Sequence, residues 1–357
     1  MFPFLLGISL AVQFGPMAPD APAREPRMAA SGSAVALAFG AGKGIYFSAS
    51  PDSGATFSPP VKIAEAKIVP LTRHRGPRIV FAGHTIVITA VMGRTPAEGT
   101  HAHGLPSDGD LIAWHSDNGG KTWSKGVVIN DVPGAPTEGL HALAADARGG
   151  LFAVWLDKRG GHGTMLYGAR SADGGRTWSK NVSIYQSPEG TICECCHPSV
   201  AIDSSGQILV MWRNWLAGSR DMYLVRSRDG ISFSKPEKLG TGTWQLNACP
   251  MDGGGIAISG DRVFTAWRRE GEIYLDTPGE KEIAIDAGTD VAIAATSAGA
   301  YAVWSTPAGV RAMLPGKPSP VALAPKGSFP AIVALPGGRV LAAWEDDGKI
   351  QVVPITF

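Results

Sequence analysis

Residues 116–123 read SDNGGKTW, and the same turn signature recurs as SPDSGATF at 50–57, SADGGRTW at 171–178 and a shortened SRDGISF at 227–233. In such a hairpin turn the Asp or Asn side chain bonds to backbone N–H groups, and a Gly takes the positive-φ position. The aromatic residue that follows is expected to anchor the turn against the next strand. Four copies at fixed places in a longer repeat predict a β-propeller, an all-β fold built from repeated hairpins.

A second pattern lies between these turns: an apolar strand, a Gly-containing turn and a second strand ending in Trp or another large residue. Its clearest copy runs from His197 to Trp212. Together the patterns give seven units, which begin near residues 26, 77, 141, 198, 250, 290 and 330. The units that begin near 250 and 290 are about 40 residues long, close to the minimum for a four-stranded blade. We therefore predict one propeller domain over residues 24–357, with seven blades favoured and six left open.

The composition sets limits on function. The apolar fraction of 44% is ample for a core, and 32 basic against 31 acidic residues give a net charge of +1. Because these charges are interleaved along the chain, we expect neither nucleic acid nor an acidic membrane surface as a partner. No apolar segment is long enough to span a bilayer. A monomer that binds a glycan or another small molecule fits these limits.

Residues 1–23 form an apolar run followed by a Pro/Ala-rich stretch. This is typical of the apolar core and small-residue cleavage region of a secretory signal, although the usual positive charge before the core is missing. We expect the protein to be exported, either secreted or periplasmic. A disordered tail is the alternative.

Turns of this kind are known as Asp boxes, and over roughly residues 26–357 the chain resembles the sialidase (neuraminidase) superfamily of β-propellers. Asp boxes in that family lie on outer turns, away from the active site, and also occur in propellers without glycosidase activity, so the resemblance is specific for the fold. It implies three arginines that hold the substrate carboxylate, an Asp acid/base, and a Tyr nucleophile activated by a Glu.

Four arginines are candidates for this clamp. Arg78, in Arg-Ile-Val, stands where the family has Arg-Ile-Pro, and Arg94 resembles the Gly-Arg that closes the next strand. Arg213 follows the strand-ending Trp212, and Arg268 follows a similar Trp. Solvated or carboxylate-paired arginines at strand ends are the alternative interpretation.

The candidate nucleophiles are Tyr274 and Tyr301, which occur in late units, where the family places its Tyr. Each lies within an apolar strand run, which favours a role in the core. The catalytic set is therefore incomplete in the sequence.

Three of the four cysteines, Cys193, Cys195 and Cys196, lie within four residues and are followed directly by His197. The fourth, Cys249, precedes the Pro that opens the next unit and is followed by Met251. Because equivalent positions of adjacent blades converge around the central channel, we expect the two segments to be neighbours in space.

This cluster has three interpretations. An even number of cysteines in an exported protein suggests disulfides, such as a link from the triplet to Cys249. Alternatively, thiolates with a His and a Met are soft ligands suited to copper, or to zinc with less use for Met. Imidazoles from His141, His101 or His103 could complete such a site. Free or redox-active thiols are the third interpretation.

Two further residues stand near the cluster in the sequence. Glu194 is a candidate catalytic carboxylate, metal ligand or solvated loop residue, and Trp244 is a candidate for lining a rim pocket. The functional face is predicted where residues 94–110, 185–198 and 241–255 meet. The leading function is exo-α-sialidase-type hydrolysis of a terminal acidic sugar. The alternative is a non-catalytic binding or metal-carrying propeller that uses the Cys/His/Met rim.

Overall fold

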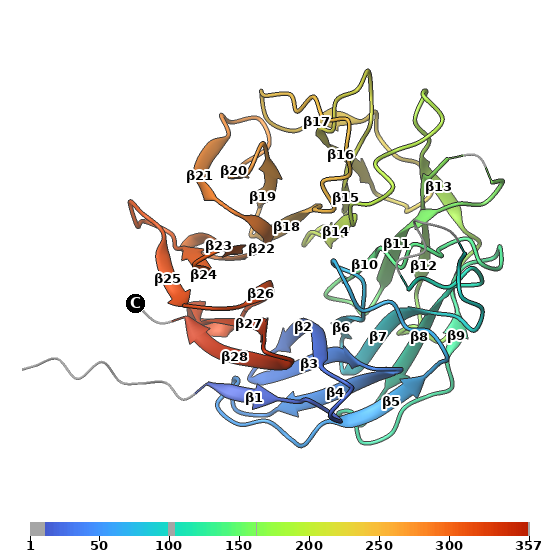
Figure 1. Ribbon diagram of the computed structural model, residues 1–357, viewed down its shortest axis with the longest axis vertical. Helices are drawn as coiled ribbons and strands as arrows, with labels where there is room; N and C mark the ends of the chain where they lie inside the picture. The colour runs from blue at the N-terminus through green and yellow to red at the C-terminus, as the bar shows by residue number, and fades with distance from the viewer. Residues whose placement is uncertain (1–10, 99–103, 162, 356–357) are drawn as a thin grey trace, which may run out of the picture.

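The computed structural model describes residues 11–98, 104–161 and 163–355. These residues form seven four-stranded antiparallel sheets arranged as blades around a central axis (Figure 1). The prediction of a seven-bladed all-β propeller is confirmed, and the six-bladed alternative is excluded. Among the described residues the single helix is the short 3-10 helix Pro336–Gly338, and no helix is long and apolar enough to cross a membrane.

Each of the first three blades uses four consecutive strands, counted from the channel outward. Blade 1 consists of β2 (Ala23–Ser31), β3 (Ala34–Ala41), β4 (Gly44–Ser50) and β5 (Val61–Glu65). Blade 2 consists of β6 (Arg78–Ala82), β7 (Thr85–Met92), β8 (Asp110–Ser116) and β9 (Val127–Val128). Blade 3 consists of β10 (His141–Ala145), β11 (Leu151–Asp157), β12 (Met165–Ser171) and β13 (Val182–Tyr185).

The next three blades repeat this order. Blade 4 consists of β14 (Ser199–Ile202), β15 (Ile208–Arg213), β16 (Met222–Ser227) and β17 (Glu237–Lys238). Blade 5 consists of β18 (Gly254–Ser259), β19 (Arg262–Arg269), β20 (Glu272–Asp276) and β21 (Ile283–Ala287). Blade 6 consists of β22 (Thr289–Thr296), β23 (Gly299–Thr306), β24 (Gly309–Met313) and β25 (Val321–Ala324).

Blade 7 closes the ring by joining the two ends of the chain. It contains β26 (Ser328–Ala334), β27 (Val340–Asp346) and β28 (Lys349–Ile355), and its outer strand is β1 (Val12–Phe14). Phe14 pairs with Ile350 and packs its ring against Phe39 of blade 1 and Phe57. The ring thus includes residues 12–14, which belong to the segment predicted as a leader. Export itself stays a prediction.

The core lies between blades, and tryptophans dominate it. Trp155, Trp212, Trp267 and Trp304, each near the end of a blade's second strand, are among the largest fully buried side chains. Trp267 packs on apolar residues of blade 4 and Trp304 on those of blade 5, so these rings lie between blades. Burying 150–250 Å² of such a ring contributes about 4–6 kcal/mol at about 25 cal/mol per Å².

The four repeated turns share one hydrogen-bond pattern. In the turn at 171–178, Ser171 Oγ donates to Asp173 Oδ1 at 2.8 Å, and the Gly175 and Thr177 N–H groups donate back to these two side chains at 2.9 Å each. The aromatic residue reaches the preceding blade rather than only the next strand. Trp123, for example, lies edge-on to Phe47 of blade 1, with 5.1 Å between ring centroids. Each turn therefore holds two blades together.

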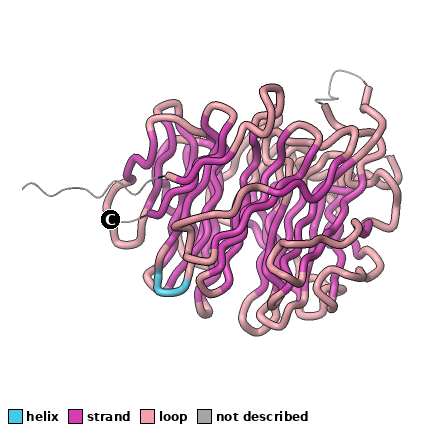
Figure 2. The backbone as a smooth tube through the Cα atoms, turned by 90° about the horizontal axis from the view of Figure 1, so that it is seen from below, coloured by secondary structure: helices cyan, strands magenta, loops and turns pink. Residues whose placement is uncertain are grey.

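These turns define one face of the ring, and the long connections lie on the other. The described parts of the connections all lie at the end of the blades opposite the repeated turns: 66–77, 93–98, 104–109, 129–140, 158–161, 163–164, 186–198, 214–221 and 239–253. The 3-10 helix marks the face of the turns in Figure 2. We call the face with the long connections the loop face. It includes the described residues of all three connections that contain the segments predicted to form the functional face, 94–110, 185–198 and 241–255.

Candidate functional site

His74 lies at the mouth of the central channel on the loop face. It is buried, and its backbone has a φ of 67°. Its ring stacks obliquely on His197, with 4.2 Å between ring centroids, and meets the ring of Phe329 edge-on at 5.4 Å. His74 Nε2 lies 2.9 Å from Asp290 Oδ1. Residues from four different blades or connections thus meet at one point on the axis.

Bulged inner strands bring some of these side chains to the axis. β2, β22 and β26 each contain a register shift near their start. At each shift one residue with a left-handed backbone, Glu25, Asp290 or Phe329, has a φ between 49° and 59°. Non-glycine residues rarely adopt this conformation, and bulges that re-aim side chains are common beside active sites. The same device in three consecutive blades therefore marks the channel mouth as the candidate site.

Asp252 completes an acid–imidazole cluster. Its Oδ2 accepts the Asp290 backbone N–H at 3.0 Å, and suitable atoms of His74, Asp252 and Asp290 all lie within 4.8 Å of one another. Asp252 is buried, and its Oδ1 has no hydrogen-bond partner among the described residues. An orphaned carboxylate oxygen at such a depth is costly unless it carries a proton or meets a ligand.

The surroundings separate the pKa values of these groups. Burial raises the pKa of Asp252, and the charge of Asp290 adds to that effect. Burial also acts against the charged form of Asp290, but the hydrogen bond and charge of His74 outweigh it and hold the Asp290 pKa below its usual value. Burial acts to lower the pKa of His74, but the hydrogen bond and charge of Asp290 outweigh it, so the pKa of His74 is raised. A carboxyl group of raised pKa beside one of lowered pKa is the arrangement used in acid–base catalysis.

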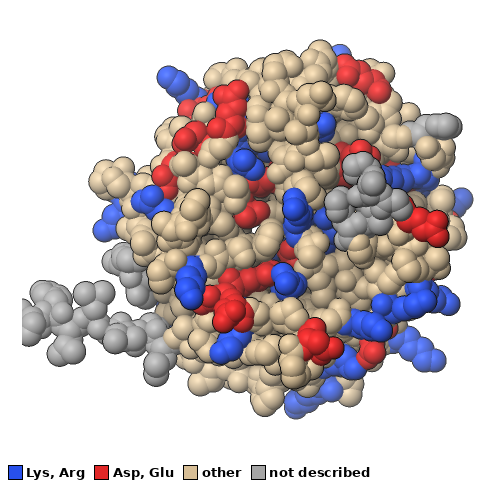
Figure 3. Space-filling model, in the orientation of Figure 1, with Lys and Arg blue, Asp and Glu red and all other residues tan. Residues whose placement is uncertain are grey.

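Two further carboxyl groups support the cluster from blades 1 and 7. Glu25 Oε1 accepts the His74 backbone N–H at 2.8 Å, and the Glu25 N–H donates to Glu345 Oε1 at 2.7 Å. Burial, followed by the charge of Glu25, raises the pKa of Glu345 to about 7. Figure 3, which views the loop face, shows acidic side chains gathered around the centre of the ring with basic ones beside them.

A cavity of about 700 Å³ opens beside this cluster, over blades 5 to 7 where the connections are short. Asp290, Arg268 and Arg311 line it. Arg311 is paired with Asp286 at 2.8 Å, whereas Arg268 has no carboxylate within 4 Å and its buried Nε has no hydrogen-bond partner among the described residues. The cavity therefore presents an ionised carboxylate together with an unpaired guanidinium.

The four predicted arginines do not converge. Arg78 is buried, and its guanidinium donates to the carbonyls of His74 and Pro77 at 2.6 and 2.9 Å. Arg213 is also buried and donates through each of its three nitrogens to a backbone carbonyl, as described below. Arg94 and Arg268 line two separate cavities, and Arg78 lines a third, the central channel, so no cavity holds two of the four.

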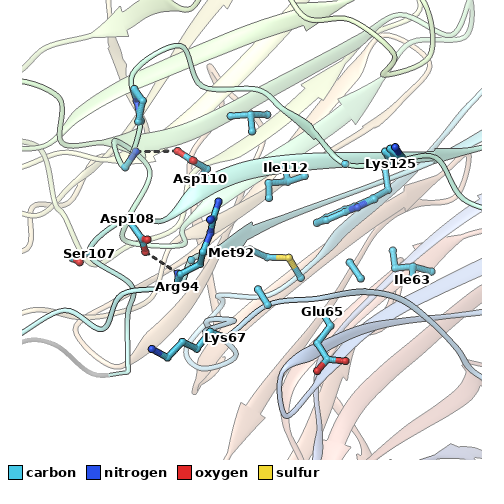
Figure 4. Close-up of a pocket in the computed structure, with 18 of the residues that line it drawn as sticks. Ile63, Glu65, Lys67, Met92, Arg94, Ser107, Asp108, Asp110, Ile112 and Lys125 are labelled. Atoms are coloured by element: carbon cyan, nitrogen blue, oxygen red, sulfur yellow. Dashed lines mark hydrogen bonds between the residues drawn. The ribbon is translucent and has the colours of Figure 1, made fainter.

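Arg94 lies in a larger groove of about 950 Å³ between the outer strands of blades 1 and 2 (Figure 4). The acids of this groove are engaged in local structure: Asp108 accepts the Arg94 backbone N–H at 2.8 Å, and Asp110 accepts from Asn130 at 2.7 Å. The groove contains no cluster comparable to that at the channel mouth. Although it is larger, it is the weaker candidate for chemistry.

The other predicted residues have structural surroundings. Tyr274 stacks on Trp267 at 6.3 Å, and Tyr301 packs into the core between blades 6 and 7, so both match the interpretation as core residues. Trp244 is buried between the guanidiniums of Arg213 and Arg268, at 5.2 and 5.6 Å, and does not line an open rim pocket.

Three of the predicted metal ligands come together. Cys193, Cys195 and Cys196 are buried with their sulfurs close to one another, and Met251 packs against them. All four cysteines, each among the described residues, are free thiols. Cys249 is exposed and lies outside the sulfur group. The structure therefore supports neither a disulfide nor a shared metal ion between Cys249 and the triplet.

The imidazoles and Glu194 also lie outside the sulfur group. His197 faces the channel and its Nδ1 accepts the Gly253 N–H at 3.3 Å. His141 is buried against Thr89 at 3.0 Å, and burial lowers its pKa to about 3. Glu194 is half exposed and lies 3.7 Å from Lys158. The predicted ligands His101 and His103 lie outside the described residues.

Sequence reasoning missed His74, Asp252 and Asp290 as a site. A signal was present, because each lies at or just before the start of an inner strand, the position that His197 occupies in its own unit. Alignment of the seven units on that position would have placed these residues around one axis.

Comparisons with known proteins bear on the fold. No protein-family model matches the chain, and neither does any curated protein. Among solved structures, an ulvan lyase described as a new family of polysaccharide lyase has a TM-score of 0.59 at 12% identity, covering 97% of this chain and 98% of that chain. A protein of unknown function from Dyadobacter fermentans has a TM-score of 0.57 at 15% identity, with 95% and 96% covered.

A Hadza microbial sialidase has a TM-score of 0.54 at 14% identity, covering 90% of this chain and 73% of that chain. At such identities the likeness concerns the fold alone. The chain therefore has an overall fold similar to structures that include a sialidase, an α-L-arabinanase and a polysaccharide lyase.

Proposed function

We propose that the protein cleaves glycans that carry an acidic sugar, in the cavity beside the channel mouth. The observation that carries this proposal is the pairing, in one cavity, of the ionised Asp290 with the unpaired guanidinium of Arg268. A guanidinium without a carboxylate partner is suited to a carboxylate on the ligand, which it can bind through two parallel hydrogen bonds. Solved structures of similar fold, among them a sialidase, an α-L-arabinanase and a polysaccharide lyase, support a glycan as the substrate.

Asp290 is the residue that would contact the reacting atoms. Its ionised state suits it to accept a proton from water during hydrolysis, or from the sugar during elimination. His74 and Asp252 would act as positioning residues, because both are buried and both bond to Asp290. Of the two reactions we put hydrolysis of a terminal acidic sugar, as in an exo-sialidase, first. A complete three-arginine clamp is not part of the proposal, because Arg78 donates to carbonyls.

The test is a paired assay on the full chain. A methylumbelliferyl α-sialoside reports hydrolysis by fluorescence, and a uronic-acid polysaccharide reports elimination by the ultraviolet absorbance of its unsaturated product. We expect Asp290→Asn to lower kcat/KM by about 100-fold or more. Arg268→Ala should raise KM by about 10–100-fold, because the loss of one hydrogen bond to a charged group weakens binding by about that factor.

Arg94→Ala is the matched control, because it removes a guanidinium from the other cavity. Activity that falls in Arg94→Ala but not in Arg268→Ala would move the site to the groove between blades 1 and 2. Binding of the glycan without turnover by the wild type would favour the alternative, a non-catalytic binding propeller.

We also propose that the protein is exported, on the basis of residues 1–23. N-terminal sequencing of protein recovered from the periplasm or the medium tests this point. Recovery from the cytoplasm alone, with an intact N-terminus, would contradict it.

A further inference from the structure

The three buried cysteines form a compact triangle of sulfurs on the loop face. The Sγ–Sγ distances are 3.4 Å between Cys193 and Cys196, 3.7 Å between Cys193 and Cys195, and 4.0 Å between Cys195 and Cys196. The loop is held from both sides, because the Cys193 N–H donates to the Arg213 carbonyl at 3.2 Å and the Ile192 N–H to the Thr164 carbonyl at 3.0 Å. The backbone therefore fixes this triangle.

The size of the triangle matches a metal ion. One point in the plane of the triangle is equidistant from the three sulfurs. Its distance from each sulfur equals the product of the three side lengths divided by four times the area of the triangle. For sides of 3.4, 3.7 and 4.0 Å that distance is about 2.2 Å. Metal–thiolate bonds are about 2.3 Å long. An ion at or just above the centre of the triangle would thus bond to all three sulfurs with little movement.

The charges around the triangle require an anion. Arg220 is buried, and its Nη1 donates to Cys193 Sγ at 3.1 Å. Arg213 is buried beside it and donates to the Arg220 carbonyl at 2.7 Å. Among the described residues both guanidiniums hydrogen-bond only to backbone carbonyls and to Cys193 Sγ, and buried charges are rarely left unpaired. Ionised thiolates would supply the missing negative charge.

We propose that Cys193, Cys195 and Cys196 bind one monovalent copper ion in three-coordinate thiolate geometry. Three thiolates, two buried guanidiniums and one monovalent cation sum to zero charge, whereas a divalent ion would leave a buried positive charge. Thiolates are soft ligands that select monovalent copper. Zinc takes four ligands in its structural sites, and the structure offers no fourth thiolate or imidazole within the described group.

Met251 covers the site. It packs against the three cysteines from the neighbouring connection, and its backbone has a left-handed φ of 54°. Its Sδ accepts a hydrogen bond from Arg73 Nη1 at 2.7 Å, so Met251 shields the site by packing and does not supply a fourth strong ligand.

A disulfide between Cys193 and Cys196 is the competing state. These residues form a Cys-x-x-Cys pair whose sulfurs lie 3.4 Å apart, against about 2.05 Å in a disulfide. Such a bond would remove two of the three ligands. Copper binding and thiol counting on one sample therefore separate the two states.

The experiment loads the full chain with monovalent copper under anaerobic, reducing conditions and removes excess metal by gel filtration. We expect one copper per chain by mass spectrometry and sulfur-only coordination by X-ray absorption. Copper affinity is measured by competition with the chelator bicinchoninate. Replacing any one of Cys193, Cys195 or Cys196 with Ser should weaken binding by more than about 100-fold, since even changes behind the ligands cost 10–100-fold.

Cys249→Ser is the matched control and should bind copper as the wild type does, because Cys249 lies outside the triangle. Equal loss of copper in Cys249→Ser would overturn the three-cysteine assignment. Stoichiometric binding of Zn²⁺ without binding of monovalent copper would overturn the choice of metal. A Cys193–Cys196 disulfide that persists in the reducing buffer and excludes copper would overturn the site. X-ray absorption on the wild type decides the question even if a variant fails to fold.

Discussion

Replacement of Arg213 by Met separates a structural role from a substrate-binding role. Arg213 is 1% exposed, and its guanidinium donates to the carbonyls of Asp252 at 3.1 Å, Arg220 at 2.7 Å and Arg268 at 2.8 Å. Two of these carbonyls belong to different connections on the loop face, and that of Arg268 lies at the end of β19. The side chain therefore ties together the connections that position both Asp252 and the cysteines.

The magnitude follows from these three bonds. A hydrogen bond to a charged group contributes about 1.5–3 kcal/mol, and Met recovers part of the loss by packing, so we expect the free energy of unfolding to fall by about 3–5 kcal/mol. For 357 residues the unfolding entropy is about 0.75 kcal/mol/K, at about 2.1 cal/mol/K per residue. A loss of 4 kcal/mol then lowers Tm by about 5 °C.

Urea unfolding followed by tryptophan fluorescence measures the change directly. Arg94→Met is the control, because Arg94 is exposed, and its effect should stay within about 0.5 kcal/mol. Arg213→Lys should recover only part of the stability, since one ammonium cannot span three carbonyls. A loss below about 1 kcal/mol in Arg213→Met, with KM for an acidic glycan strongly raised, would refute the structural role and restore Arg213 as a substrate ligand.

Three further outcomes are expected. In urea unfolding, Gly120→Ala should destabilise the fold by about 1–3 kcal/mol more than Gly119→Ala. Both glycines have a positive φ, but only a Cβ at position 120 would collide with a ring of blade 1. Equal losses of stability in the two variants would contradict this. Phe14→Ala should cost about 3–5 kcal/mol, because its buried ring seals the joint between blades 7 and 1, and a loss within 1 kcal/mol would mean that β1 is dispensable. Because the pKa of His74 is raised in the folded state, protonated His74 stabilises the fold fully below its unfolded pKa of about 6.5, and this stabilisation is lost as pH rises through the folded pKa. Wild-type Tm should therefore decline from pH 6 to 9, and Asp290→Asn should flatten that decline. Parallel curves for the two proteins would contradict the pairing of His74 with Asp290.

The fold could be predicted because its signals are local and repeated. Each turn at 50–57, 116–123, 171–178 and 227–233 forms its hydrogen bonds within its own few residues, so a short window contains all the information. A tryptophan lies near the end of the second strand in each of blades 3 to 7 and packs against the neighbouring blade. What such windows cannot show is ring closure by β1, because its partner strand β28 lies at the other end of the chain.

The site could be predicted only in part, for a physical reason. His74 and Asp290 are 216 residues apart, and Asp290 reaches the axis because a bulge and a left-handed backbone turn it inward. No residue type in the sequence predicts a left-handed backbone at that position. Likewise the sequence marks Arg78 as an arginine at a strand start, but only the fold shows that its guanidinium is directed at backbone carbonyls. The cysteine triplet was predicted because its three members share one loop.

The proposed copper site and the channel mouth share a wall. Cys196 is followed directly by His197, which stacks on His74, and Met251, which covers the sulfurs, is followed directly by Asp252. A cysteine substitution that shifts either connection would therefore move a member of the acid–imidazole cluster even if copper takes no part in the reaction. Loss of glycan cleavage in a cysteine variant cannot by itself assign the metal a catalytic role. The decisive comparison is the wild-type protein with and without copper. An unchanged pH profile of kcat would mean that the ion only holds the two connections together. A shifted profile would show that the charge of the ion changes the protonation of His74.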